Sequence, residues 1–394
     1  MSALWQHKAM DSDDNPAQAQ GIVSIHQGQK MRVVLMGAGH IGRRIASLLS
    51  GSQDFEVKVM DRSAAALQRL QGLPVETCLI DTSDTDALRQ SLAGCDAVIN
   101  ALPYYMATTI ARQALVAGCN YFDLTEDMQA TREIMKLAET APTAFMPQCG
   151  LAPGFVGIVA HHLAQRFNQL QEVKMRVGAL PAFPTNALKY NLTWSVDGLI
   201  NEYCNACEAI RDGHKIEVLP LEGLEHFSLD GTEYEAFNTS GGLGTLCETL
   251  QGRVRSLDYK SVRYPGHCDL MKMLLQELQL KDDPETLKAI LRRSVPSTMQ
   301  DVVLVFVTVT GERDGVLVQE AFARKIFAER SESAPLSAIQ ITTAAGVCAA
   351  VDLFREGKLP ARGFIRQEQV ALPDFLANRF GCTYQQSRQV ESIG

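Results

Sequence analysis

Hydrophobic and polar positions along the first third of the chain follow a repeating order of strand and helix. Residues 31–36 form an apolar run typical of a buried strand, and after Gly42 the apolar residues resume at helical spacing. Further strands are predicted at residues 55–62, 74–81, 96–103, 120–127 and 143–150, with helices at 63–73, 84–94, 108–118 and 128–141. Strands alternating with helices predict an α/β fold with a doubly wound parallel sheet.

The pattern changes after residue 155. A helix is predicted at 157–167, strand-like runs follow at 172–181, 187–195, 214–221 and 225–237, and two strands in 301–329 are joined by a turn at Gly311–Gly315. These runs predict a second α+β domain on a mixed or antiparallel sheet. A long apolar helix at 336–359 is expected to return to the first domain. We therefore expect a first domain of residues 31–154 plus 335–394 and a second domain of residues 155–334.

Length and composition narrow the class of protein. A chain of 394 residues suggests two domains, and the polar first 30 residues resemble a poorly ordered extension, not a secretory signal. A net charge of −8 without a basic stripe argues against a nucleic-acid partner, and no unbroken run predicts a membrane span. The scattered cysteines suggest reduced thiols and a cytoplasmic protein. Cys204 and Cys207 lie in a predicted helix with no second pair, so no metal site is expected.

The glycines after the first strand carry the clearest chemical signal. Gly37 permits a tight turn, Gly39 lets the backbone approach a pyrophosphate, and Gly42 lets the next helix pack closely on its strand. This pattern predicts a Rossmann-type dinucleotide site. Asp61 ends the second strand, where an acid accepts hydrogen bonds from the ribose hydroxyls and favours NAD. Arg62 beside it leaves NADP open, because an arginine there can hold the additional phosphate.

The carboxyl ends of the other parallel strands complete the predicted cofactor site. Asp81 with Thr82 could bind the adenine side of the cofactor or cap the following helix, and the sequence favours neither alternative. The predicted cofactor-binding residues are Gly37, Gly39, His40, Ile41, Gly42, Asp61, Arg62, Asp81, Thr82, Asn100, Ala101, Leu102, Pro103, Tyr105, Gly150, Pro153 and Gly154.

Four blocks of sequence resemble the saccharopine dehydrogenase-like oxidoreductases, in order and spacing, and the resemblance covers nearly everything from Met31 onward. The blocks are CGLAPGF (149–155), YNLTWSVDGLINEY (190–203), EAFNTSGGLGTL (235–246) and YKSVRYPGHCDLM (259–271). Within the family, the chain is most similar to lysine 6-dehydrogenase. Gly266 and His267 follow Tyr264-Pro265, where fungal-type saccharopine reductases carry an asparagine-arginine-aspartate run.

The resemblance implies an NAD(P)-dependent oxidation of a carbon–nitrogen bond in lysine or a lysine-derived amino acid. It also implies that the second domain binds this small-molecule substrate and pairs two copies into a homodimer. Saccharopine or a carboxynorspermidine-type substrate is an alternative, and a protein that senses NAD(P) without chemistry is an alternative of another class.

Such a reaction needs a base for the amine proton and a cation for the substrate carboxylate. Arg263 is the candidate cation, with a surface ion pair as the plain structural alternative. His267 is a candidate for the amine proton or for activating water, or it is a packed histidine. Tyr190 and Trp194 alternate at strand spacing and would wall the pocket or belong to the core. Tyr264 lies in the same block and is included in the substrate site.

The remaining candidates lie near the expected nicotinamide. By resemblance, Tyr104 lies close to the hydride-transfer face. Asp123 and Glu126 follow a strand end, where one carboxylate would hold the substrate's α-ammonium or assist proton transfer, or would cap the next helix. Ser240 and Gly241 could supply backbone donors or form a simple turn.

Overall fold

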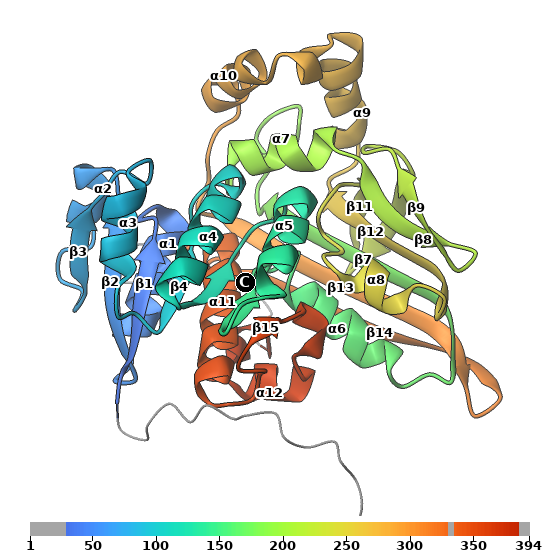
Figure 1. The fold of residues 1–394 in the computed structure, drawn as a ribbon. Helices are drawn as coiled ribbons and strands as arrows, with labels where there is room; N and C mark the ends of the chain where they lie inside the picture. The colour runs from blue at the N-terminus through green and yellow to red at the C-terminus, as the bar shows by residue number, and fades with distance from the viewer. Residues whose placement is uncertain (1–28, 330–334, 386–394) are drawn as a thin grey trace, which may run out of the picture.

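The computed structural model describes residues 29–329 and 335–385. The predicted extension at 1–30 therefore lies outside the described residues except for its last two. Two sheets dominate the fold: the first includes the blue strands at the left of Figure 1, and the second is built from the green to orange strands at its right. The helix α11 (Ala338–Arg355) packs against strands of both sheets, so the two sheets share one central layer of helix.

The first sheet has seven strands, in the order β15-β6-β5-β4-β1-β2-β3, and every pair in it is parallel. This confirms the predicted doubly wound sheet. The chain leaves β1 toward β2 on one side and returns as β4 on the other, so the carboxyl ends of β1 and β4 flank the crevice where such folds bind ligands. The strands are β1 (Met31–Met36), β2 (Phe55–Asp61), β3 (Glu76–Leu79), β4 (Ala97–Asn100), β5 (Asn120–Asp123), β6 (Ala144–Met146) and β15 (Gly363–Phe364).

Helices cover both faces of this sheet, as the alternating pattern predicts. Side chains cap the starts of three of them; Asp127, for example, accepts from Ala130 N at 2.7 Å at the start of α5. These helices are α1 (His40–Ser50), α2 (Ala64–Gln68), α3 (Thr85–Leu92), α4 (Ala107–Ala117) and α5 (Met128–Ala138), and the short η1 (Tyr104–Met106) precedes α4.

The second sheet has eight strands and is mixed, as predicted. Its main path is β10-β11-β12-β7-β13-β14, with β8 paired to β12 and β9 paired to β8; β12 and β7 are parallel and the other pairs are antiparallel. The strands are β7 (Gln169–Pro181), β8 (Cys207–Arg211), β9 (His214–Val218), β10 (Glu225–Leu229), β11 (Thr232–Asn238), β12 (Val254–Arg263), β13 (Asp301–Arg313) and β14 (Val316–Phe327). The valines of β13 from Val303 to Val309 are buried against the helices α6 (Phe155–Ala164) and α11.

A helical arm rises above the second sheet at the top of Figure 1. It contains α7 (Val196–Cys204), α9 (His267–Lys272), the π-helix η2 (Met273–Glu277), η3 (Leu280–Asp282) and α10 (Pro284–Ser294), while α8 (Leu246–Leu250) packs on β8. Asp197 ties α10 to α7 through ion pairs with Lys288 at 2.7 Å and Arg292 at 3.1 Å. The helices of the arm share one apolar cluster, which also includes Phe237 of β11, so the arm packs on the second sheet as part of the second domain.

Two predictions for this region are wrong. Residues 187–195 form a loop with one bridge, between Leu192 and Ser297, because their alternating apolar side chains pack into the arm and not onto a strand face. Cys204 and Cys207 do not share a helix: Cys204 ends α7, Asn205 takes an extended backbone, and Cys207 begins β8. All ten cysteines are free thiols in the structure.

The predicted long helix is confirmed as α11 (Ala338–Arg355), and it is buried on nearly every face. It packs against α1 and β5 of the first sheet and against β13 and β14 of the second. Among the described residues it is the one helix long and apolar enough to cross a bilayer, and 89% of that window is buried inside the protein. Its composition is therefore that of a core helix.

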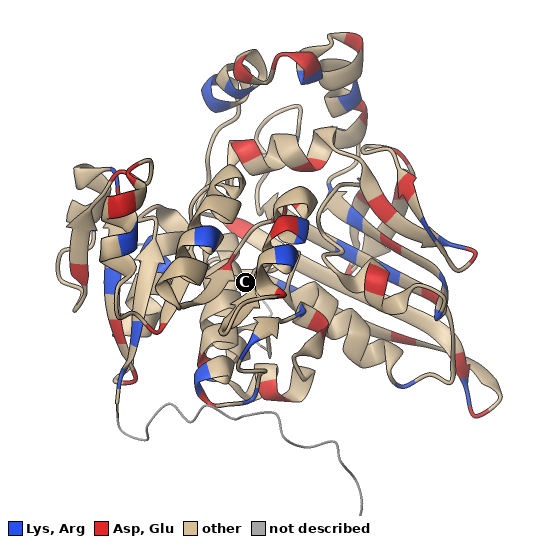
Figure 2. Cartoon of the chain, in the orientation of Figure 1, with Lys and Arg blue, Asp and Glu red and all other residues tan. Residues whose placement is uncertain are grey.

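The chain then adds β15 to the first sheet and ends its described part with η4 (Gln367–Gln369), α12 (Leu372–Ala377) and η5 (Gly381–Gln385). Lysines and arginines are interspersed with aspartates and glutamates over both sheets and their helices in the view of Figure 2. The electrostatic character of any cleft is therefore set by the few charged side chains that line it.

Candidate active site

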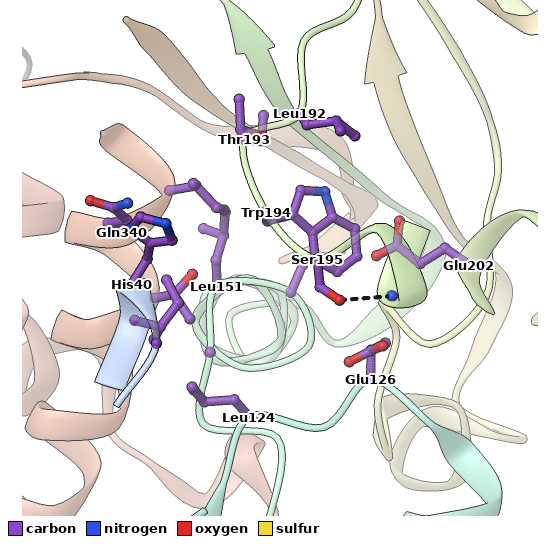
Figure 3. A pocket seen from close by; sticks show the side chains of 18 of the residues that line it. His40, Leu124, Glu126, Leu151, Leu192, Thr193, Trp194, Ser195, Glu202 and Gln340 are labelled. Carbon is purple, nitrogen blue, oxygen red and sulfur yellow. Dashed lines mark hydrogen bonds between the residues drawn. The ribbon is translucent and has the colours of Figure 1, made fainter. Parts of the chain in front are cut away.

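A cavity of about 590 Å³ lies between the carboxyl ends of the first sheet and one face of the second. The first domain contributes Gly39–Gly42, Ala101–Tyr104, Leu124, Glu126 and Gly150–Pro153. The second contributes Val177, Ala179, Leu192–Ser195, Gly198, Glu202, Tyr259, Ser261, Arg263 and Ser297–Met299, and α11 contributes Ile339, Gln340 and Thr343. Figure 3 shows His40 and Gln340 on one side of this cavity and Trp194, Glu126 and Glu202 on the other.

The glycine turn fits a dinucleotide. A Cβ on Gly37 would lie 2.9 Å from Ala101 O, and one on Gly42 would lie 1.9 Å from Gly37 O, so both positions require glycine for packing. A Cβ on Gly39 would meet no atom within 4 Å and would extend into open space. No side chain caps α1, so the N–H groups of its first turn remain available to a phosphate.

Most predicted cofactor residues line the cavity. Those that do are Gly39, His40, Ile41, Gly42, Ala101, Leu102, Pro103, Gly150 and Pro153. Two more predicted residues contact lining residues without lining the cavity themselves. Asn100 accepts from Leu102 N at 3.2 Å, and a Cβ on Gly154 would lie 2.2 Å from Gly150 O. Tyr105 does not line the cavity and is 62% exposed.

The acids expected at the adenosine side lie at the ends of β2 and β3. Asp61 accepts from Ala38 N at 2.7 Å and from Ser63 N at 2.8 Å, so it holds the glycine turn in place at the end of β2. Arg62 and Asp81 are exposed. Asp81 accepts from Ser83 N at 3.0 Å, and this bond lowers its pKa. The helix-cap alternative for Asp81 is wrong, because Asp84 caps α3; Thr82 lies between them.

Arg263 is the single arginine or lysine among the cavity-lining residues in the described part of the chain. It ends β12 and is buried, with Nε donating to Tyr203 Oη at 2.9 Å and Nη1 donating to Val262 O at 2.8 Å. Its guanidinium lies over the ring of Tyr190, 5.1 Å from the centroid. No carboxylate of the described residues lies within ion-pair distance, whereas the buried Arg176 pairs with both Glu225 and Asp258. Arg263 is therefore a buried cation that lacks a protein anion.

Two glutamates share the cavity with Arg263. Glu202 projects from α7, and burial raises its pKa to about 8 although Arg263 opposes this shift. Glu126 follows β5, and burial raises its pKa to about 7. Glu126 also raises the pKa of Glu202 and of Tyr104, while Arg263 acts on Glu202. All four groups line the cavity, Arg263 and Glu202 from the second domain and Glu126 and Tyr104 from the first. A Cβ on Gly198 of α7 would lie 3.1 Å from Glu126 Oε1, so this carboxylate packs against the helix that carries Glu202.

His267 does not line the cavity but lies behind Arg263. Its Nδ1 is 2.8 Å from Leu188 O, which can only accept, so Nδ1 carries the proton. Burial and the neighbouring Arg263 lower the pKa of His267 to about 3, so the ring is neutral and its Nε2 accepts from Tyr203 Oη at 3.1 Å. The predicted role of His267 as a base does not fit this placement, because both ring nitrogens are engaged away from the cavity.

Other predicted substrate residues are also structural in this arrangement. Asp123 is fully buried and accepts from Gln148 N at 2.8 Å, Thr125 N at 3.0 Å and the Tyr121 hydroxyl at 2.8 Å, and burial raises its pKa to about 6. The hydroxyl of Tyr264 donates to Pro181 O at 2.9 Å. Neither side chain lines the cavity.

The predicted aromatic residues and the pair Ser240 and Gly241 do not all line the same cavity. Tyr104 and Trp194 line the cavity, whereas Tyr190 is buried beneath Arg263. Ser240 and Gly241 line a second, smaller cavity that Glu126 also reaches.

Glu202 and Tyr203 were missed from the sequence, although both lie in the block 190–203. Gly198 and Glu202 are four residues apart and both face the cavity from α7. An acid on an otherwise apolar helix face, one turn after a glycine, was the available signal. The glycine has a steric reason: a Cβ there would lie 2.3 Å from the Trp194 ring.

Two family models match nearly all of the described chain. The family model for the saccharopine dehydrogenase NADP binding domain matches residues 33–146, and the model for the saccharopine dehydrogenase C-terminal domain matches residues 150–380. Mitochondrial alpha-aminoadipic semialdehyde synthase from Rattus norvegicus is 22% identical over 197 residues, which is 48% of this chain and 21% of that protein. The Bos taurus enzyme is 22% identical over 227 residues, or 53% and 24%. The chain thus spans about a quarter or less of these relatives.

Solved structures show the same fold. Apo saccharopine dehydrogenase (L-Glu forming) from Saccharomyces cerevisiae superposes with a TM-score of 0.73 at 18% identity, over 88% of this chain and 96% of that one. Homospermidine synthase from Legionella pneumophila, solved with NAD, gives 0.64 at 15% identity over 90% of each chain. Because the two family models together span nearly all of residues 33–380, the chain belongs to the saccharopine dehydrogenase family of NAD(P)-dependent oxidoreductases.

Proposed function

We propose that the protein oxidises the side-chain amine of lysine, or of a lysine-like amino acid with one carboxylate, and passes the hydride to a nicotinamide dinucleotide. The observation that carries this proposal is a cavity lined by a buried arginine without a protein anion and by two glutamates, Glu202, which is buried, and Glu126, which is partly buried. Lysine has the complementary charges, one carboxylate and two amines. Buried charges are stable when they are paired, so each group of the substrate would satisfy one side chain of the cavity.

The domain from which each side chain lines the cavity suggests the orientation of the substrate. Arg263 would bind the carboxylate through its planar fork, and Glu202 beside it would bind the α-ammonium. Glu126 lies nearer the cofactor half and Tyr104, so the reacting amine would reach it there. A nicotinamide dinucleotide, when bound, supplies the hydride acceptor.

Glu126 would act as the base. With a pKa of about 7 it is largely ionised just above neutral pH and can accept a proton from the amine. With the dinucleotide bound, the electron pair of the C–H bond would leave as hydride to the nicotinamide, an N–H proton of the neutral amine would go to Glu126, and a C=N bond would form. Water then adds to this imine, ammonia leaves, and a semialdehyde remains.

The same charges argue against saccharopine as the preferred substrate. Saccharopine carries three carboxylates, and the described lining residues offer one arginine to bind them and two glutamates to repel them. A carboxynorspermidine-type substrate has one carboxylate and several amines, so it remains the second candidate. A single cation among the lining residues therefore favours substrates with a single carboxylate.

The test is reduced-cofactor formation with lysine, saccharopine and carboxynorspermidine in parallel, with NAD and with NADP, over a range of alkaline pH. We expect kcat/KM to be highest for lysine and lowest for saccharopine. Tight binding of the reduced cofactor without turnover of any amine would contradict the enzyme reading and favour a nucleotide sensor. Preferred turnover of saccharopine would contradict the charge argument alone.

A further inference from the structure

A second cavity of about 210 Å³ adjoins the first, and Glu126 lines both. It lies between the start of α5, the end of α7 and the turn after β11. Its lining is mostly polar and includes Asn201, Thr239, Ser240 and the ion pair of Arg132 with Glu208. A polar cavity of this size has room for several water molecules.

The second cavity reaches the surface. Five of its lining residues are exposed and form its mouth: Gln129, Arg132, Asn205, Ala206 and Glu217. At its inner end, Thr239 and Ser261 share a hydrogen bond of 2.8 Å between their hydroxyls, and Ser261 lines the first cavity. One hydrogen bond between hydroxyls therefore joins the wall of the first cavity to the polar lining of the second.

We propose that this second cavity is the route by which the proton taken from the substrate amine passes from Glu126 to solvent. This inference rests on the proposed function. During the reaction the first cavity holds both the amino acid and the nicotinamide, which closes the direct way from Glu126 to bulk water. The second cavity stays open on the other side of the same carboxylate.

The charges around Glu126 fit a group that must release its proton again. Asp123 and Asp127 flank it in its own loop, Glu202 faces it from α7, and Tyr104 lies beside it from η1. Arg132 on α5 is held by Glu208, so it does not form an ion pair with Glu126. Acidic neighbours favour the protonated carboxyl, so fast turnover needs an efficient way for the proton to leave.

Gly241 allows the turn after β11 to pack closely beside Glu126, the residue that lines both cavities. It has a φ of +85°, and a Cβ on it would lie 2.3 Å from Glu126 O. The turn after β11 therefore packs directly on the backbone of Glu126 and forms one wall of the route.

Two substitutions can close the mouth from opposite sides, Ala206→Phe on the loop after α7 and Gln129→Phe on α5. With a pH indicator in weak buffer, we expect the wild-type protein to release protons in step with NAD(P)H formation. In the closed variants the rate of the first turnover would stay within twofold of the wild-type rate, because Glu126 can still accept one proton. Proton release and steady-state turnover would slow tenfold or more, which produces a burst of NAD(P)H.

Ala65→Phe is the matched control, since Ala65 is an exposed alanine on α2 that lines neither cavity. A second measurement needs no turnover: deuterium exchange of the Glu126 carboxyl in the unreactive complex with NADH and lysine, in which the first cavity is filled, followed by its infrared C=O stretch and identified by the loss of this band in Glu126→Gln. We expect exchange to slow tenfold or more in the closed variants. Exchange and proton release that are unchanged in both closed variants would overturn the route. If the wild-type protein shows no turnover, but exchange is slowed in the closed variants as expected, only the proposed function would be overturned.

Discussion

Arg263 donates a hydrogen bond from Nε to the hydroxyl of Tyr203 at 2.9 Å, and this contact connects the cavity to a chain of neutral groups behind it. Tyr203 in turn donates to Nε2 of His267, whose Nδ1 donates to the carbonyl of Leu188. The chain leaves Nη2 of Arg263 without a hydrogen-bond partner among the described residues. A fixed guanidinium with a free edge is suited to a carboxylate ligand.

Replacing Arg263 with lysine is expected to raise the KM for the amino acid about tenfold to hundredfold, because hydrogen bonds to a charged group contribute roughly 1.5–3 kcal/mol. Lysine keeps the charge but loses the planar fork. The measurement is steady-state kinetics with each substrate varied in turn. Arg112→Lys on the exposed side of α4 serves as the control. An equal rise in the KM for the cofactor would remove Arg263 from carboxylate binding.

His267→Leu is expected to raise the KM for the amino acid about tenfold, because Tyr203 loses its acceptor and no longer fixes Arg263. His267→Gln retains an acceptor and a donor and is expected to recover most of the loss. Because His267 is neutral above about pH 3, the histidine and glutamine enzymes are expected to share one pH profile between pH 5.5 and 7.5. A limb near pH 6.5 that vanishes in His267→Gln would restore His267 as a titrating catalytic group.

Glu126→Gln is expected to lower kcat for amine oxidation by about 10²–10⁴-fold, the range for loss of a general base. In the wild-type protein, kcat/KM is expected to rise with pH through about 7, since Glu126 accepts the proton only when ionised. The glutamine variant would lack this limb and keep any limb that arises from the substrate amine. A pH profile unchanged by the substitution would exclude Glu126 as the base.

Glu202→Gln is expected to stabilise the protein without ligands at high pH. The pKa of Glu202 is about 8 in the folded state and near 4.5 in the unfolded state, so the folded state binds more protons between these values. The free energy of unfolding therefore falls as pH rises through this window, by an amount on the order of a few kcal/mol. Glutamine cannot ionise and avoids this loss. Denaturant unfolding at pH 5 and pH 9 would show similar stability at pH 5 and a more stable variant at pH 9; a destabilised variant at pH 9 would contradict the expectation.

Two alanine substitutions in the glycine turn separate binding from folding. Gly39→Ala adds a methyl group where the fold has open space, so stability is expected to be unchanged and the Kd for NADH to rise about tenfold. Gly42→Ala places Cβ 1.9 Å from Gly37 O and is expected to destabilise the protein by roughly 1–3 kcal/mol or more. NADH fluorescence titration and thermal unfolding measure the two effects. Equal loss of stability in both variants would contradict the distinction.

The cofactor half of the site was accessible from the sequence because it depends on local rules. Gly37, Gly39 and Gly42 follow a recognisable strand, and parallel strands bring their carboxyl ends to one edge. Tyr105 shows the limit of that rule, since being near a strand end does not determine the direction of a side chain. Asp123 shows a second limit: its carboxylate accepts a hydrogen bond from the backbone N–H of Gln148 and does not face the cavity.

The substrate half depends on how separate elements pack, which the sequence does not encode locally. Arg263 and His267 are four residues apart, yet Gly266, with a φ of +97°, turns the chain between them and directs His267 behind the cavity wall. Glu202 could not be assigned, because its role requires α7 to lie across from Glu126. The loop 187–195 has the alternation of a strand, but its apolar side chains pack on helices.

The late return of the chain to the first sheet has a consequence for biosynthesis. The strand β15 and the helix α11 that packs on α1 are encoded after the whole second sheet. A nascent chain that has already produced the glycine turn still lacks part of the core that supports it. The nucleotide-binding domain cannot complete its fold on the ribosome before the substrate domain has emerged, so the protein does not follow the usual order in which the N-terminal domain finishes first.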